Sequence, residues 1–154
     1  MIPLKRCKPV MVFGYQISLD GLAETHNLTR VGLDGNNTFD HILSNLKTIR
    51  DNVKLNTFSI VTRTNVTRQI YDGLEQYFEF FKDEFGKDQR FVCKIHKTGD
   101  WGGGAVRSLD NQFCSSIDIV TVLKYAVENS VPVWRTYESQ LHWFNKHHIH
   151  GTLG

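Results

Sequence analysis

The stretch VMVFGYQISLDG, residues 10–21, decides the fold of this chain. The part that ends at Ser18 is mostly bulky or β-branched and too short for a helix, so it predicts a buried strand over residues 10–18. The strand then gives way to Asp20 and Gly21, which are residue types that favour a loop. Two later segments repeat this change from an apolar strand to polar residues.

The same pattern predicts two more strands, at residues 56–63 and 90–96. A helix is expected after each strand: one begins at a cap formed by Thr38, one begins at a cap formed by Thr67, and one covers residues 116–129. Connections of this length suit right-handed crossovers between parallel strands. The sequence therefore predicts an α/β fold built from about three parallel strand–helix units.

Polar side chains gather on one face of the predicted sheet. Successive residues of a strand point to opposite faces, and the apolar residues of the three strands share one face. Toward the carboxyl ends of the strands, the other face carries Ser18, Arg63, Asn65, Lys94 and His96. Because ligands of parallel α/β proteins bind at that end of the sheet, the pattern predicts a cleft there. The alternative is that these groups bond to one another or face water.

The composition is that of an ordinary globular domain. The 154 residues include 40% hydrophobic and 22% charged residues with a net charge of +2, which indicates neither disorder nor nucleic-acid binding. No apolar run is long enough for a bilayer span, and we expect a cytoplasmic protein. Cys7, Cys93 and Cys114 are too widely spaced for a disulfide framework or a zinc site.

Four short motifs follow one another along the chain: ISLDGLAETHNLTR at residues 17–30, NTFD at residues 37–40, RTNVT at residues 63–67 and GDWGG at residues 99–103. In type, order and spacing they resemble the radical SAM enzymes of the sulfatase-maturase and SPASM-associated group. That group carries an S-x-D-G…H-[DN]-x-x-R element, a G-x-x-T-F helix start and an R-x-N-V-T segment. The resemblance covers about residues 10–105.

The resemblance implies a partial (β/α) barrel in which the three strands correspond to strands four to six of six. Residues 1–130 are then the rear half of the barrel, and residues 131–154 are a C-terminal extension that begins a truncated downstream region. The implied activity is reductive cleavage of S-adenosylmethionine by a 4Fe–4S cluster, followed by radical modification of a peptide or protein substrate. The family's Cys-x-x-x-Cys-x-x-Cys loop and Gly-Gly-Glu segment are absent from the sequence. We therefore expect an enzyme fragment that is inactive alone.

Site residues follow from the resemblance and from the polar face together. The resemblance assigns Ser18 and Arg30 to the ribose and carboxylate region of S-adenosylmethionine. The cleft wall adds Arg63 and Asn65 as cofactor-binding residues, because a guanidinium group suits an anionic part of the ligand. Residues expected to bind substrate are Lys94, His96 and Trp101. No catalytic residue and no metal ligand is assigned.

Two other functions stay open. One is a non-catalytic half-barrel that a partner completes, with self-association through exposed sheet edges. The other is an unrelated metal-dependent α/β hydrolase or lyase that uses Asp20, His26 and Asp100. Local structural roles compete with both, because Asp20 can shape its loop and His26 can bond to backbone. For the C-terminal histidines we expect adventitious metal affinity only, and these are His142, His147, His148 and His150.

Overall fold

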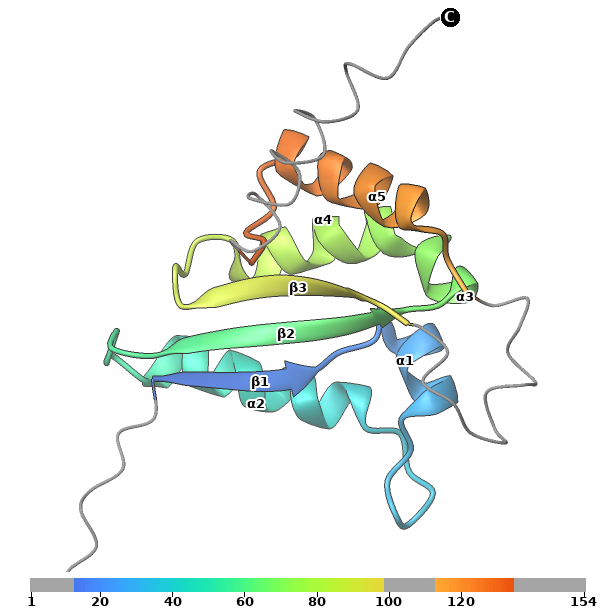
Figure 1. Cartoon of the computed structure of the whole chain (residues 1–154). Helices are drawn as coiled ribbons and strands as arrows, with labels where there is room; N and C mark the ends of the chain where they lie inside the picture. Colours follow the sequence, from blue (N-terminus) through green and yellow to red (C-terminus); the bar gives the residue numbers. More distant parts are fainter. Residues whose placement is uncertain (1–12, 99–112, 135–154) are drawn as a thin grey trace, which may run out of the picture.

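A three-stranded parallel sheet forms the centre of the protein in a computed structural model that describes residues 13–98 and 113–134 (Figure 1). The strand order is β1–β2–β3, with β1 at Gly14–Ser18, β2 at Ser59–Val66 and β3 at Phe91–Lys97. Strands and helices alternate along the chain. These features confirm the predicted α/β class, while the barrel stays a prediction.

The helices bury the apolar face of the sheet. In chain order they are α1 (Ala23–Thr29), α2 (Phe39–Asn52), α3 (Arg68–Tyr71), α4 (Leu74–Phe85) and α5 (Ser116–Glu128). The side chains of α2 and α4 form one core with Ile60, Cys93 and Ile95 of the sheet, and α5 packs against α4 and β3 (Figure 1). Five positions of α4 at helical spacing are buried, and Phe85 stacks on Phe91 with ring centroids 4.6 Å apart.

The strand register brings the polar residues of the sheet into line. Ser18 lies opposite Arg63, and Arg63 lies opposite Lys94. Two residues further along, Asn65 lies opposite His96. Because the strands are parallel, these side chains share the face away from the core, near the carboxyl ends. This is the alignment that the alternation of residues predicts.

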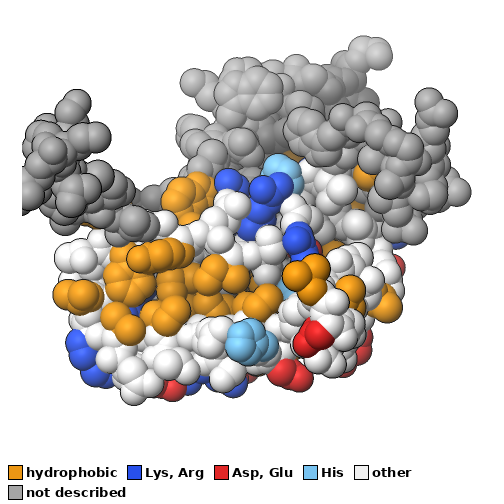
Figure 2. All heavy atoms as spheres, turned by 90° about the horizontal axis from the view of Figure 1, so that it is seen from below, with side chains coloured by type: hydrophobic (Ala, Val, Ile, Leu, Met, Phe, Trp, Pro, Cys, Tyr) orange, Lys and Arg blue, Asp and Glu red, His pale blue; other side chains and the backbone are white. Residues whose placement is uncertain are grey.

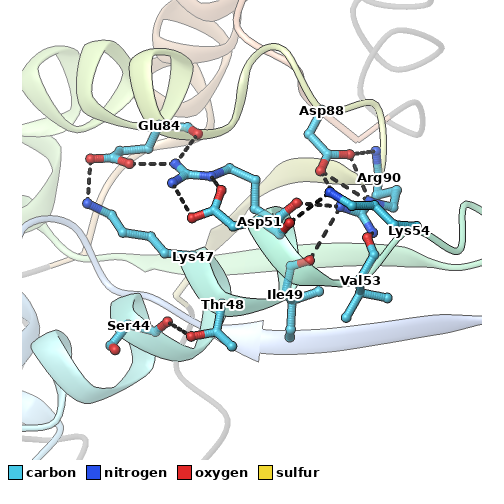
Figure 3. Close-up of polar contacts among 11 residues, drawn as sticks. Ser44, Lys47, Thr48, Ile49, Asp51, Val53, Lys54, Glu84, Asp88 and Arg90 are labelled. Carbon is cyan, nitrogen blue, oxygen red and sulfur yellow. Dashed lines mark hydrogen bonds and ion pairs between the residues drawn. The ribbon is translucent and has the colours of Figure 1, made fainter.

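A network of hydrogen bonds and ion pairs lies at the amino ends of the strands (Figure 3). Arg90, which directly precedes β3, pairs with Asp88 at 2.6 Å and donates to carbonyl oxygens at the C-terminal end of α2. Beside it, Glu84 of α4 accepts from Lys47 at 2.6 Å and from Arg50 at 2.8 Å. The network ties α2, α4 and β3 together at the amino ends of the strands.

The structure corrects three expectations about the helices. The loop predicted before Thr38 contains α1, and the single helix predicted after Thr67 is divided into α3 and α4 at Gly73. The hydroxyl of Thr67 does cap α3, because it accepts from the backbone N–H of Ile70. Thr38 precedes α2 without capping it through its side chain. The carboxamide of Asn27 instead accepts from the first N–H of α2 at 3.1 Å.

The two edges of the sheet differ. Val133 forms a parallel bridge with Cys93, and the backbone of Cys93 bonds to Pro132 at 2.7 Å and to Trp134 at 2.9 Å. Residues 131–134 therefore lie along β3. On the other side, no strand pairs with the outer edge of β1 within residues 13–98 and 113–134.

Candidate functional site

A cleft of about 410 Å³ opens at the carboxyl ends of the strands. It is lined by Asp20, Thr29, Arg30, Arg63, Asn65, Thr67, Ile70, His96 and Thr98. Four predicted site residues meet there, from the end of α1, from β2 and from β3. This is the position where parallel α/β proteins bind ligands.

Asp20 organises one wall of the cleft and is only 3% exposed. One carboxylate oxygen accepts from the backbone N–H and the side-chain amide of Asn65, at 2.7 and 3.1 Å. The other accepts from Nε of Arg30 at 2.8 Å. The next residue, Gly21, has φ of +80°, and a Cβ there would lie 2.3 Å from the Thr25 hydroxyl. Asp20 and Gly21 thus shape the loop, which was the structural alternative for them.

His26 is a fully buried structural residue. Its Nδ1 accepts from the backbone N–H of Asp20 at 3.1 Å, so the ring proton lies on Nε2. Nε2 donates to the hydroxyl of Thr38 at 3.1 Å, and this hydroxyl donates to the carbonyl of Arg30 at 2.6 Å. Burial lowers the pKa of His26, which favours the neutral ring. Because both ring nitrogens are engaged, His26 does not support a metal-dependent hydrolase or lyase.

Arg30 keeps part of its guanidinium group for a ligand. The bond to Asp20 uses Nε, and the side chain is 42% exposed at the rim of the cleft. Within the described part of the chain, no hydrogen bond uses its two terminal amino groups. Those groups can form two parallel bonds to a carboxylate, as the resemblance implies.

Arg63 and His96 form the opposite wall, on β2 and β3. Nε of Arg63 and the hydroxyl of Thr98 are buried and have no hydrogen-bond partner among the described residues. Burial lowers the pKa of His96, and the neighbouring charges of Arg63 and Lys94 lower it further. This wall is therefore rich in hydrogen-bond donors and positive charge.

Two predicted residues lie next to the cleft but do not line it. Ser18 ends β1, is half-buried and lies opposite Arg63 in the register. Lys94 flanks Arg63 on the other side. Trp101 lies outside the described residues, as do Asp100, Cys7 and the C-terminal histidines.

Sequence reasoning gave Thr98 no role in the cleft. Thr98 follows the end of β3, and the alternation that selected His96 also selects the residue two positions later. Extending the strand pattern by two residues would have found it.

The site fits the two cofactors of the resemblance differently. The free amino groups of Arg30 and the amide of Asn65 suit the carboxylate and ribose of S-adenosylmethionine. The described cysteines do not suit an iron–sulfur cluster, because Cys93 lies in the core, where burial raises the pKa of its thiol to about 12. Burial likewise raises the pKa of Cys114. Cluster ligands are thiolates, and neither environment favours one.

Comparison with models of known families, with curated proteins and with solved structures gives no match. In residues 13–98 and 113–134, no helix has both the length and the apolar character needed to cross a bilayer.

Proposed function

We propose that this chain is the S-adenosylmethionine-binding half of a radical SAM-type barrel. The observation that carries the proposal is the cleft, which gathers Arg30, Arg63 and Asn65 at the carboxyl ends of parallel strands. These are three of the four residues assigned to the cofactor on the sequence, and the fourth, Ser18, ends the neighbouring strand. Arg30 follows α1, whereas Arg63 and Asn65 lie on β2 more than thirty residues later, so the meeting of Arg30 with the other two is not a consequence of sequence proximity.

Arg30, Asn65 and Ser18 each have a separate role in holding the cofactor, and Arg63 adds positive charge to the same cleft. The terminal amino groups of Arg30 bind the carboxylate, while its Nε stays with Asp20. The side-chain nitrogen of Asn65 is bonded to Asp20, so its amide oxygen is left to accept from a ribose hydroxyl. Ser18 offers a hydroxyl at the end of β1. When bound, S-adenosylmethionine supplies the group that abstracts hydrogen from a peptide or protein substrate.

Catalysis requires more strands than these three. A three-stranded sheet does not close a barrel, and the outer edge of β1 is unpaired in the described structure. The sequence has no Cys-x-x-x-Cys-x-x-Cys loop to bind the cluster. The proposal therefore assigns this chain cofactor binding, and assigns cluster binding to a polypeptide that extends the sheet at β1.

Calorimetric titration of the full chain with S-adenosylmethionine tests the proposal. We expect saturable binding, weakened about tenfold or more in Arg30→Gln, because the loss of a paired guanidinium–carboxylate contact costs at least 1.4 kcal/mol. Lys124→Gln is the matched control, since Lys124 is 71% exposed on α5 and does not line the cleft. Absence of saturable binding, or equal affinity of Arg30→Gln and the unchanged protein, would refute the proposal.

A further inference from the structure

We propose that Arg63 and His96 in the cleft, together with Lys94 beside it, form a second anion site, and that the substrate binds there through a carboxylate or phosphate group. Assigning this anion to the substrate rests on the proposed function, whereas the anion site does not. Three further observations carry it: unbalanced charge, unpaired donors and separation from the pair formed by Arg30 and Asp20.

The first observation is the charge on this wall. Arg63 and Lys94 lie side by side in the register, and both act electrostatically on His96. None of the ion pairs between described residues includes Arg63 or Lys94. Neighbouring like charges repel each other, and an anion bound between them offsets this repulsion. A bound oxyanion would supply the missing negative charge.

The second observation is a pair of unused donors. Nε of Arg63 and the hydroxyl of Thr98 are both buried, both line the cleft and both lack a partner among the described residues. Buried polar groups in folded proteins are nearly always hydrogen-bonded. Carboxylate and phosphate oxygens accept from guanidinium and hydroxyl donors, so one oxyanion can satisfy both groups.

The third observation separates this site from the cofactor's carboxylate. The charge of Arg30 is already balanced by Asp20, at 2.8 Å. Arg30 follows α1, whereas Arg63 lies on β2 and has no ion pair with a described residue. The two arginines thus belong to different clusters on different elements. The pair formed by Arg30 and Asp20 is neutral overall, whereas the group formed by Arg63, Lys94 and His96 has a positive charge that no described carboxylate balances.

The ionisable groups around His96 decide how binding depends on pH. Arg63 faces it from β2, Lys94 from β3, and the pair formed by Asp20 and Arg30 lines the cleft from the β1–α1 side. An anion near His96 favours the protonated ring, so binding raises the pKa of His96. By linkage, the affinity for the anion increases as pH falls through that pKa.

The test uses the full chain at low ionic strength, titrated with inorganic phosphate and, separately, with acetate. Binding is followed by calorimetry and by the NMR signals of the His96 ring. We expect saturable binding of at least one anion, together with an upward shift of the pKa of His96. Affinity should fall about tenfold in Arg63→Gln and severalfold in Lys94→Gln, because each variant removes a charged donor. Arg30→Gln should keep the shift of the His96 signals on anion binding, and Lys124→Gln should bind like the unchanged protein.

Several outcomes would overturn the inference. Absence of saturable binding, or unchanged affinity in both Arg63→Gln and Lys94→Gln, means that no site is built here. Equal loss in Arg30→Gln means one merged site. Displacement of phosphate or acetate by S-adenosylmethionine assigns the anion to the cofactor and removes the substrate assignment.

If phosphate or acetate binds as expected while S-adenosylmethionine does not, the anion site stands and the proposed function falls. Circular dichroism of each variant shows whether a loss of binding comes from a loss of folding. If Arg63→Gln does not fold, the affinity of Lys94→Gln decides the test.

Discussion

Asp20 joins the loop after β1 to the end of β2 through one buried carboxylate. Replacing it by alanine removes two bonds from Asn65 and one from Arg30. Bonds to a charged group contribute more than neutral ones, and we expect Asp20→Ala to lower the free energy of unfolding by about 3 kcal/mol. Urea denaturation measures the loss. The control Asp83→Asn changes an exposed carboxylate on α4 and should stay within about 0.5 kcal/mol of the unchanged protein. A similar value for both variants would contradict the structural role of Asp20.

His26 should make the stability depend on pH. Burial lowers its pKa below the ordinary value of 6.5, so between those two values the unfolded chain binds more protons than the folded one. Stability from this group is therefore complete above about pH 6.5 and is lost as pH falls toward the folded-state pKa. His96 contributes with the same sign. Urea denaturation between pH 5 and 7.5 should show a shallower dependence in His26→Asn than in the unchanged protein. Parallel curves would show that His26 does not take up a proton on unfolding.

For single residues, the sequence predicted which face of the sheet a side chain lies on better than it predicted the side chain's hydrogen-bond partner. The alternation along a strand is fixed by backbone geometry, so the shared face of Arg63 and His96 could be read from the order of residues. The bond between Asp20 and Asn65 joins residues 45 apart in the chain, and nothing local to either one specifies it. For this reason Asp20 had two open roles until the loop geometry was known.

At the scale of the elements, the amino ends of the strands carry stabilising contacts, whereas the carboxyl ends carry the cleft. Arg90 at the amino end is 11% exposed and bonds to Asp88 and to backbone carbonyls at the end of α2. We expect Arg90→Met to lower the free energy of unfolding by about 3 kcal/mol, because it leaves Asp88 and those carbonyls without their partner. Arg90→Lys should recover only part of the loss, since an ammonium group does not reproduce the guanidinium fork.

The same variants separate stability from binding. Arg90 and the cleft lie at opposite ends of the sheet, so a folded Arg90→Lys protein should bind S-adenosylmethionine with unchanged affinity. Calorimetry at a temperature below the unfolding transition measures this. A parallel loss of stability and affinity would mean that the two ends are coupled.

The sequence predicted the helices that carry an apolar stripe and missed α1, which has none. Helix α4 has its stripe of aromatic residues, and α5 is capped by Ser115, which forms a capping box with Asp118. Helix α1 is seven residues long and buries only His26, so no periodicity reveals it. It is held by the bonds of His26 and Asn27 to other segments. Tertiary contacts of this kind outweigh local propensity in short helices.

At the scale of the whole molecule, the outer edge of β1 is a strand edge without a partner among the described residues. Figure 2 views the molecule from the side of β1 and α2 and shows hydrophobic side chains gathered there. Phe13 is 63% exposed and Tyr15 is 50% exposed. An unpaired strand edge beside exposed apolar side chains favours pairing with another chain. The proposed function needs that edge for additional strands, and without them the edge is free to pair with a second copy.

We therefore expect the isolated chain to self-associate, with an average mass that rises above 17.8 kDa as concentration increases. Tyr15→Lys should shift this equilibrium toward the monomer, because a charge at a strand edge opposes pairing. Ile117→Lys is the matched control: Ile117 is 70% exposed on α5, so the variant removes a similarly exposed apolar side chain away from the edge. Light scattering over a concentration series distinguishes the two variants. A monomer at every concentration, or equal effects of both substitutions, would show that the β1 edge does not drive association and would weaken the case that further strands complete this sheet.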